Sequence, residues 1–195
     1  MTGRLDGPFS LIWREDLYRQ VSGEPSDIRD HLPYLLNCAT ARPVIVELGV
    51  RTGRSTAALL LGAHWSKGHV WSVDVNPPDV DPIRLQDPRW SFAQCESTSS
   101  QAQVFAPAEI DLLFVDTSHD YGQTVAELAV WVPRVKRDGG IVLLHDTQWD
   151  HGDVSLPEPV GPVALALDAY TAQHGLTWYN RDSPPGLYGL GVIEL

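Results

Sequence analysis

Short runs of apolar, largely β-branched residues alternate along this chain with longer segments of helical pattern. Five runs predict buried strands, at 44–48, 70–75, 90–95, 110–115 and 141–144. Three segments predict helices between or after them, at 55–63, 125–135 and 163–174. Apolar strands that alternate with helices indicate a parallel sheet covered on both faces, and crossover handedness favours a doubly wound α/β topology.

Two further runs close the chain, at 176–179 and 187–194, and a short link with the sequence Pro-Pro-Gly separates them. This spacing predicts an antiparallel pair at one edge of the sheet. At the other end of the chain, residues 1–40 have a partly amphipathic helical pattern, with Ser26 as the expected N-cap of a helix over 27–38. We therefore expect an N-terminal helical lid segment at 1–40 and the main domain at 41–195.

The charge and composition limit the function classes. The 195 residues carry 14 Lys+Arg and 25 Asp+Glu, a net charge of −11, and 43% are hydrophobic, which is typical of one globular domain. An acidic surface repels phosphates, so we expect neither a nucleic-acid partner nor binding to an anionic membrane. The expected partner is a small molecule, and the protein could also form a homo-oligomer. The longest apolar run, 57–63, is too short to span a bilayer. Only Cys38 and Cys95 are present, which excludes a disulfide scaffold and predicts a reducing, cytoplasmic compartment.

A glycine turn joins the first predicted strand to the helix after it. Its pattern is Glu47-x-Gly49-x-x-x-Gly53, in which Gly49 permits close approach of a ligand and Gly53 a tight entry to the helix. Asp74 ends the second predicted strand, where an acid can accept hydrogen bonds from ribose hydroxyls. The spacing differs from the Gly-x-Gly-x-x-Gly of dinucleotide sites, which argues against a nicotinamide-dependent oxidoreductase. An ordinary strand-to-helix turn is the alternative.

Four segments together resemble the class I S-adenosylmethionine-dependent methyltransferases: the glycine turn, Val73-Asp74, the run Leu-Phe-Val-Asp at 113–116, and the run from Gly139 to Asp146. The resemblance covers about residues 43–195 and implies a seven-stranded doubly wound sheet with an antiparallel last strand, and S-adenosylmethionine as the cofactor. By the resemblance, Gly49 and Gly53 border its methionine part, Asp74 holds its ribose, and Cys95 and Glu96 contact its adenine. Glu47, Ser55 and Asp116 are assigned to the same cofactor site.

Two acids follow neighbouring strands of the predicted sheet. Asp116 ends the fourth strand and Asp146 the fifth, so their carboxylates should meet at the crevice. Two close carboxylates repel unless a proton or a cation lies between them, and a hard divalent cation, Mg²⁺ above all, would serve. The alternative is that Asp146 caps the following loop and that Asp116 binds only the cofactor or the backbone.

The sequence around these acids resembles the metal-dependent small-molecule O-methyltransferases, of the catechol type and still more of the macrolide and sugar type. The shared pattern is Asp116-x-x-His119-x-Tyr121 after the fourth strand and an acid-Asp pair after the fifth. The resemblance implies that Asp116 and Asp146 are metal ligands and that His119 is the general base. This chain departs from it by placing His145 before Asp146, where the pair is often Glu-Asp. His145 is thus a second candidate base, and imidazole is a poor ligand for Mg²⁺.

The expected reaction is transfer of a methyl group to a hydroxyl of a small molecule, assisted by the cation. The sulfonium methyl is already activated, so the protein must align the acceptor and remove its proton. Aromatic residues near the crevice, Trp149 first among them, are candidates to stack on the acceptor. Two alternatives remain: a metal-independent methyltransferase, and a cofactor-binding domain without turnover.

Overall fold

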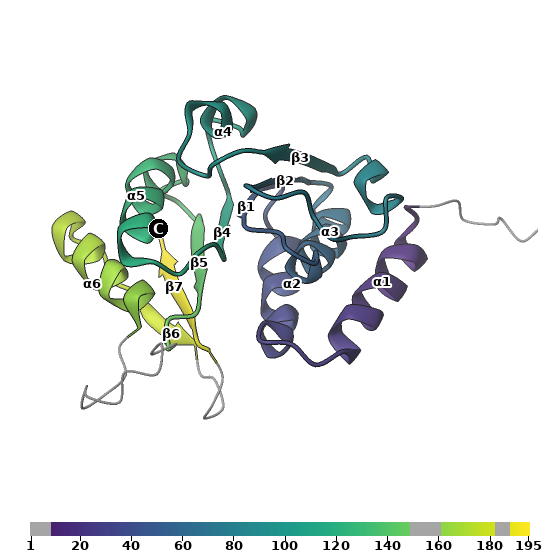
Figure 1. Cartoon of the computed structure of the whole chain (residues 1–195), viewed down its shortest axis with the longest axis horizontal. Coiled ribbons are helices and arrows are strands. Elements are labelled where there is room, and N and C mark those ends of the chain that lie inside the picture. The colour runs from purple at the N-terminus through teal and green to yellow at the C-terminus, as the bar shows by residue number, and fades with distance from the viewer. Residues whose placement is uncertain (1–8, 149–160, 182–187) are drawn as a thin grey trace, which may run out of the picture.

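The computed structural model describes residues 9–148, 161–181 and 188–195. Seven strands form one sheet in the order β3-β2-β1-β4-β5-β7-β6 (Figure 1). The strands are β1 (Val44–Leu48), β2 (His69–Asp74), β3 (Trp90–Gln94), β4 (Leu112–Val115), β5 (Ile141–His145), β6 (Tyr179–Arg181) and β7 (Leu190–Glu194). The predicted fold class, a doubly wound and mostly parallel seven-stranded sheet with an antiparallel last strand, is confirmed.

The strand order reverses between β1 and β4. From β1 the chain goes outward to β2 and β3 by parallel pairing, then returns to β4 and β5 on the other side of β1. Strand β7 pairs antiparallel with both β5 and β6. The carboxyl ends of β1 and β4 therefore lie side by side at the switch point, where ligands of open α/β sheets bind.

Helices cover both faces of the sheet (Figure 1). Residues alternate between the faces along each central strand: Ile45 packs in one core with α1, α2 and α3, whereas Val46 packs in the other with α4, α5 and α6. Both side chains are wholly buried, which explains why the strands are apolar throughout. The helices are α1 (Leu11–Gly23), α2 (Leu32–Thr40), α3 (Arg54–Ser66), α4 (Ser100–Phe105), α5 (Tyr121–Trp131) and α6 (Pro162–His174).

The predicted helix over 27–38 starts later than expected. A 3₁₀ turn occupies Arg29–His31, and α2 begins at Leu32, with no side-chain cap. Pro33 explains the start, because proline lacks an N–H and is favoured in the first helical turn. The prediction that Ser26 is the N-cap is wrong. The N-terminal helices share one core with β1 and α3, and the lid at 1–40 stays a prediction.

Other boundaries also shift. Helix α5 begins at Tyr121 and not at 125, because the carboxylate of Asp120 accepts from the backbone N–H of Gln123 (3.1 Å), and it ends at Trp131, just before Pro133. Strand β6 runs over Tyr179–Arg181 and not 176–179, and the short helix α4 was not predicted. Among the described segments, no helix is both long and apolar enough to cross a membrane.

Candidate active site

The glycine turn lies against the end of β4. Gly49 has φ +90°, and a Cβ there would come within 1.9 Å of the carbonyl oxygen of Asp116. Only glycine allows this approach. Gly53 has φ +67° and precedes the first residue of α3, again in the left-handed region. Gly53 thus gives the tight entry to α3 that the sequence suggested. Gly49 is required by the backbone of Asp116, and the approach of a ligand to it stays a prediction.

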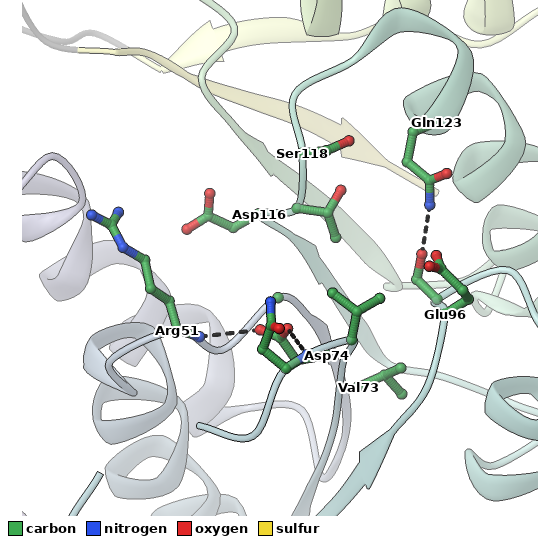
Figure 2. A pocket seen from close by; sticks show the side chains of 12 residues that line it. Arg51, Val73, Asp74, Glu96, Asp116, Ser118 and Gln123 are labelled. Atoms are coloured by element: carbon green, nitrogen blue, oxygen red, sulfur yellow. Dashed lines mark hydrogen bonds between the residues drawn. The ribbon is translucent and has the colours of Figure 1, made fainter. Parts of the chain in front are cut away.

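Asp74, at the end of β2, ties that strand to the same turn. One carboxylate oxygen accepts from the backbone N–H groups of Val50 (2.8 Å) and Arg51 (3.2 Å), and the other from that of Asn76 (2.9 Å). Figure 2 shows the contact between Arg51 and Asp74. A carboxylate has about four acceptor positions, so capacity remains for a ligand hydroxyl. Asp74 thus holds the turn in place and lines the cleft beside it.

The buried carboxylate of Glu47 lies in β1, just before the glycine turn. Glu47 is 0% exposed and accepts from the hydroxyls of Ser55 (2.7 Å), Thr56 (2.8 Å) and Ser72 (2.6 Å). Burial raises the pKa of Glu47 to about 7, against the opposing effect of these hydroxyls. Glu47 does not line the cleft described next, so its assignment to the cofactor site fits a supporting role and not a contact.

The first cleft, of about 420 Å³, opens between the ends of β1, β2, β3 and β4. Four residues assigned to the cofactor line it, namely Gly49, Asp74, Glu96 and Asp116 (Figure 2). Cys95 and Gly53 are not in its lining. The remaining lining residues are Arg51, Val73, Val75, Asn76, Ser97, Thr117, Ser118 and Gln123.

A second cleft, of about 340 Å³, lies beside the first. Its walls come from the segment 25–28, from the glycine turn with Ser55 and Arg54, and from Tyr188. Asp116 lines both clefts and therefore stands between them. Both volumes are in the range of small-molecule sites.

The predicted pair of acids is brought together, and two histidines join it. His119 Nε2 lies 2.7 Å from an oxygen of Asp146 and 3.1 Å from one of Asp116. His145 Nδ1 lies 2.9 Å from Asp146 and 3.5 Å from Asp116. Atoms of Asp116, His119 and Asp146 all lie within 4.8 Å of one another, close enough to hold one metal ion. We call these four residues the Asp–His cluster.

The charges in the Asp–His cluster compensate one another. Burial alone would lower the pKa of each histidine, but the hydrogen bonds and negative charges of the two acids outweigh it. They raise the pKa of His119 to about 9 and that of His145 to about 10. Burial alone would raise the pKa of both acids, but the two imidazoles outweigh it. They lower the pKa of Asp116 well below its usual range, and they lower the pKa of Asp146 as well. Each imidazole thus favours the ionised form of the acids beside it, and each acid favours the charged form of the imidazoles.

The backbone at the cluster is strained. His119 has φ +57° and Asp146 φ +62°, both in the left-handed region that non-glycine residues rarely adopt. Such residues cost about 1–3 kcal/mol each and gather at active sites, where the surrounding structure holds them. The strain therefore supports a functional role for the loops after β4 and β5.

A third histidine contacts this cluster from the N-terminal segment. His31 packs edge-on against His145, with ring centroids 5.5 Å apart, and both are 2% exposed. Their Nε2 atoms are buried without a hydrogen-bond partner among the described residues. Burial first, then the positive charges of His145 and Arg181, lower the pKa of His31 to about 4, so its ring is neutral.

Sequence reasoning missed several residues of the first cleft. Gln123 is one of them. Glu127, which is outside the lining of the cleft, follows four positions later on the same face of α5, together with Trp131, and this spacing was the available signal. His31 gave no signal, because nothing in its local pattern connects it with β5. Trp149, proposed for the acceptor, and most of the loop after it lie outside the described residues.

A doubly wound sheet with an antiparallel β7, a glycine turn after β1 and acids after β2 and β4 defines a class I methyltransferase. A family model described as "Methyltransferase domain" matches residues 46–147, and the chain belongs to this family. The resemblance to S-adenosylmethionine-dependent methyltransferases is thereby confirmed. A search of curated proteins finds no match.

Solved structures agree on the fold. Cofactor-bound Rv0187 from MTB is 19% identical, with a TM-score of 0.67 over 99% of this chain and 92% of its own. An O-methyltransferase from Bacillus cereus in complex with SAH is 14% identical, with a TM-score of 0.63 over 99% of this chain and 94% of that one. The MycE methyltransferase of the mycinamycin biosynthetic pathway, with Mg, SAH and mycinamycin VI, is 17% identical, with a TM-score of 0.56 over 86% of this chain and 48% of that one.

Proposed function

We propose that this S-adenosylmethionine-dependent methyltransferase transfers a methyl group to a hydroxyl oxygen of a small molecule, assisted by a divalent cation. One observation carries the proposal: Asp116 lines both clefts and also belongs to the Asp–His cluster. A methyl donor in the first cleft and an acceptor in the second would thus meet beside the cluster.

The first cleft suits the cofactor. Asp74 has acceptor capacity for ribose hydroxyls, and the glycine turn leaves room for the methionine part beside Gly49. The SAH in the Bacillus cereus and MycE structures supports this placement by analogy of fold.

The Asp–His cluster fits a divalent cation. Asp116 and Asp146 supply the oxygen ligands that Mg²⁺ prefers, and their carboxylates lie within 4.8 Å of each other. A cation bound there would polarise the acceptor hydroxyl and lower its pKa. The Mg in MycE lends support, again by analogy.

His119 is the proposed general base, and it must be neutral to accept a proton. The two carboxylates keep its pKa at about 9. When a cation neutralises these carboxylates, the pKa of His119 falls toward its ordinary value of 6.5, where imidazole is a good base near neutral pH. His145 is more deeply buried and lies against His31, so it suits holding Asp146 in place, although it remains the competing base.

A metal-independent methyltransferase is the second candidate. The observation that favours it is the charge balance of the Asp–His cluster, in which two imidazolium ions can neutralise two carboxylates without a cation.

Calorimetry and rate measurements test the proposal. We expect micromolar binding of S-adenosylhomocysteine, and release of S-adenosylhomocysteine from S-adenosylmethionine on a panel of phenolic and sugar hydroxyl acceptors with Mg²⁺ or Mn²⁺. Full rates in excess chelator would favour the metal-independent candidate. Failure of the folded protein to bind either cofactor form would refute both candidates.

A further inference from the structure

The loop after β4 carries two members of the Asp–His cluster, Asp116 and His119. The sheet holds its first residue, because the backbone N–H of Asp116 donates to the carbonyl oxygen of Leu48 (2.8 Å). Helix α5 holds its far end, since the carboxylate of Asp120 caps that helix and its carbonyl oxygen accepts from the backbone N–H of Thr124 (2.9 Å). Three residues, the last of them His119, lie between these two points of attachment.

One hydrogen bond attaches the first two of these three residues. The hydroxyl of Thr117 donates to the carboxylate of Glu127 on α5 (3.0 Å). Within the described part of the chain, this is the only hydrogen bond that Thr117 or Ser118 forms, whether by backbone or by side chain. Between Asp116 and His119, the hydrogen bonding of the loop to the rest of the protein therefore depends on one hydroxyl group.

Glu127 is a well-fixed partner for that hydroxyl. Its side chain is 0% exposed. Its carboxylate also accepts from the hydroxyl of Ser97 after β3 (2.5 Å) and from the side-chain amide of Gln123 (3.0 Å). A buried polar group with several hydrogen-bond partners has little freedom to move. The bond to Glu127 thus ties Thr117 to a rigid part of the protein.

The backbone of His119 needs such support because it is strained. Its φ of +57° lies in the left-handed region, which costs free energy at a non-glycine residue and persists only where the surrounding structure holds it. In this conformation, Nε2 of the imidazole lies 2.7 Å from Asp146 and 3.1 Å from Asp116. A loop that relaxed toward an ordinary φ would move the imidazole relative to both acids.

We propose that Thr117 is a positioning residue, which keeps His119 within reach of the two acids by anchoring the loop after β4 to Glu127. The effect on the reaction rests on the proposed function, because it takes His119 as the group that accepts the proton. The structural effect concerns the loop alone, so it can be tested without cation, cofactor or acceptor.

Crystal structures of the wild type, Thr117→Val and Thr117→Ser test the structural effect. Valine nearly keeps the shape of threonine but has no hydroxyl, whereas serine keeps the hydroxyl. We expect the His119 ring to leave hydrogen-bond distance of Asp146 in Thr117→Val and to stay there in the wild type and in Thr117→Ser. A His119 side chain that keeps its place in Thr117→Val would overturn the inference.

The rate is measured at saturating S-adenosylmethionine, with an acceptor from the phenolic and sugar panel. Thr117→Val should lower kcat by about 10- to 100-fold, since misplacing a reacting group by about 1 Å has an effect of this size. The KM for the acceptor should change far less. Thr117→Ser should recover most of the lost rate, because it restores the hydroxyl.

Thr171→Val is the matched control. Thr171 lies on α6, outside the lining of both clefts and outside the Asp–His cluster, and its hydroxyl donates to the carbonyl oxygen of Leu167 (2.7 Å). The same chemical change is made at both positions, so a loss of stability can appear in both variants, but the loss of kcat should appear only in Thr117→Val. Equal kcat in the two variants would overturn the inference. Absence of methyl transfer by the wild type would instead contradict the proposed function, and the crystal structures would still decide the position of His119.

Discussion

The carboxyl group of Glu47 and those of Asp116 and Asp146 lie near the same edge of the sheet, but their surroundings shift their pKa values in opposite directions. Glu47, in β1, is surrounded by three hydroxyls, and burial raises its pKa to about 7. Asp116 and Asp146, after β4 and β5, are surrounded by imidazoles that lower their pKa values. Hydroxyls can stabilise a carboxyl group that gains a proton, whereas two adjacent carboxylates need positive charge.

Exposure differs in the same way. The Glu47 carboxylate is wholly enclosed, but the side chains of Asp116 and His119 are 25% and 21% exposed, and Asp116 lines both clefts. The difference agrees with the proposal that Glu47 supports the site and that the Asp–His cluster performs the chemistry.

The largest expected effect belongs to His119. His119→Ala should lower the methyl-transfer rate by about 10²–10⁴-fold, the usual contribution of a general base, with cofactor binding unchanged. His145→Ala is the matched comparison, measured with the same acceptor. If His145→Ala loses the rate and His119→Ala keeps it, the two roles must be exchanged.

The pH profile should respond to the cation. Neutral imidazole is the active form, so the rate is lost as the pH falls below the pKa of His119. Without a divalent cation this midpoint should lie near the pKa of about 9 that the carboxylates impose, and saturating Mg²⁺ should move it downward. A midpoint that does not change with the cation would argue against a cation next to His119.

Removal of one acid should abolish the cation dependence. Asp146→Ala should lower the rate by about 10²-fold and make it insensitive to Mg²⁺ and to chelator, because it removes one of two oxygen ligands. Affinity for S-adenosylhomocysteine, measured by calorimetry, should change little. Asp146→Asn, which keeps the shape, should show the same loss if charge is what matters.

Asp74 should affect binding and not the chemical step. Asp74→Ala should weaken the binding of S-adenosylhomocysteine by about 1.5–3 kcal/mol, the contribution of a charge-assisted hydrogen bond. Because Asp74 also accepts from Val50 and Arg51, Asp74→Asn serves as a comparison that keeps part of these contacts. Unchanged affinity in Asp74→Ala would remove Asp74 from the cofactor site.

The smallest effect concerns the stability contributed by Glu47. Its folded pKa of about 7 exceeds its ordinary value of 4.5, so the folded state binds more protons between these values. The stability due to Glu47 is therefore fully present below about pH 4.5 and is lost as the pH rises through about 7. Chemical denaturation measures the free energy of unfolding, which should fall over this pH range by about 1–2 kcal/mol less in Glu47→Gln than in the wild type. If the free energy of unfolding depends on pH equally in the wild type and the variant, the raised pKa of Glu47 is contradicted.

Much of the fold could be predicted from local pattern. The five parallel strands are apolar throughout because both faces of the sheet are covered, and that signal is strong in a single sequence. Boundaries shifted where a cap or a proline decides, as at Asp120 for α5 and Pro33 for α2. Strand β6 has partly exposed side chains, so its apolar signal is weak and its position was misplaced.

The site was predicted where residues follow a strand end directly. Asp74 is the last residue of β2, Asp116 and Asp146 directly follow β4 and β5, and the sheet topology alone brings Asp116 and Asp146 together. The contact of His31 with His145 depends on how the 3₁₀ turn before α2 packs against the end of β5, and no local pattern encodes that packing. The participation of His145 in the Asp–His cluster likewise becomes visible only from its distances to both acids.

A crystal of the protein with S-adenosylhomocysteine, soaked in Mn²⁺ and measured for anomalous scattering, would show whether a cation binds between the two acids. We predict one anomalous peak within ligand distance of Asp116 and Asp146, and adjacent to His119, with the cofactor in the first cleft. A fully occupied cofactor site without an anomalous peak, and with both imidazoles still bonded to the two carboxylates, would contradict cation-assisted transfer.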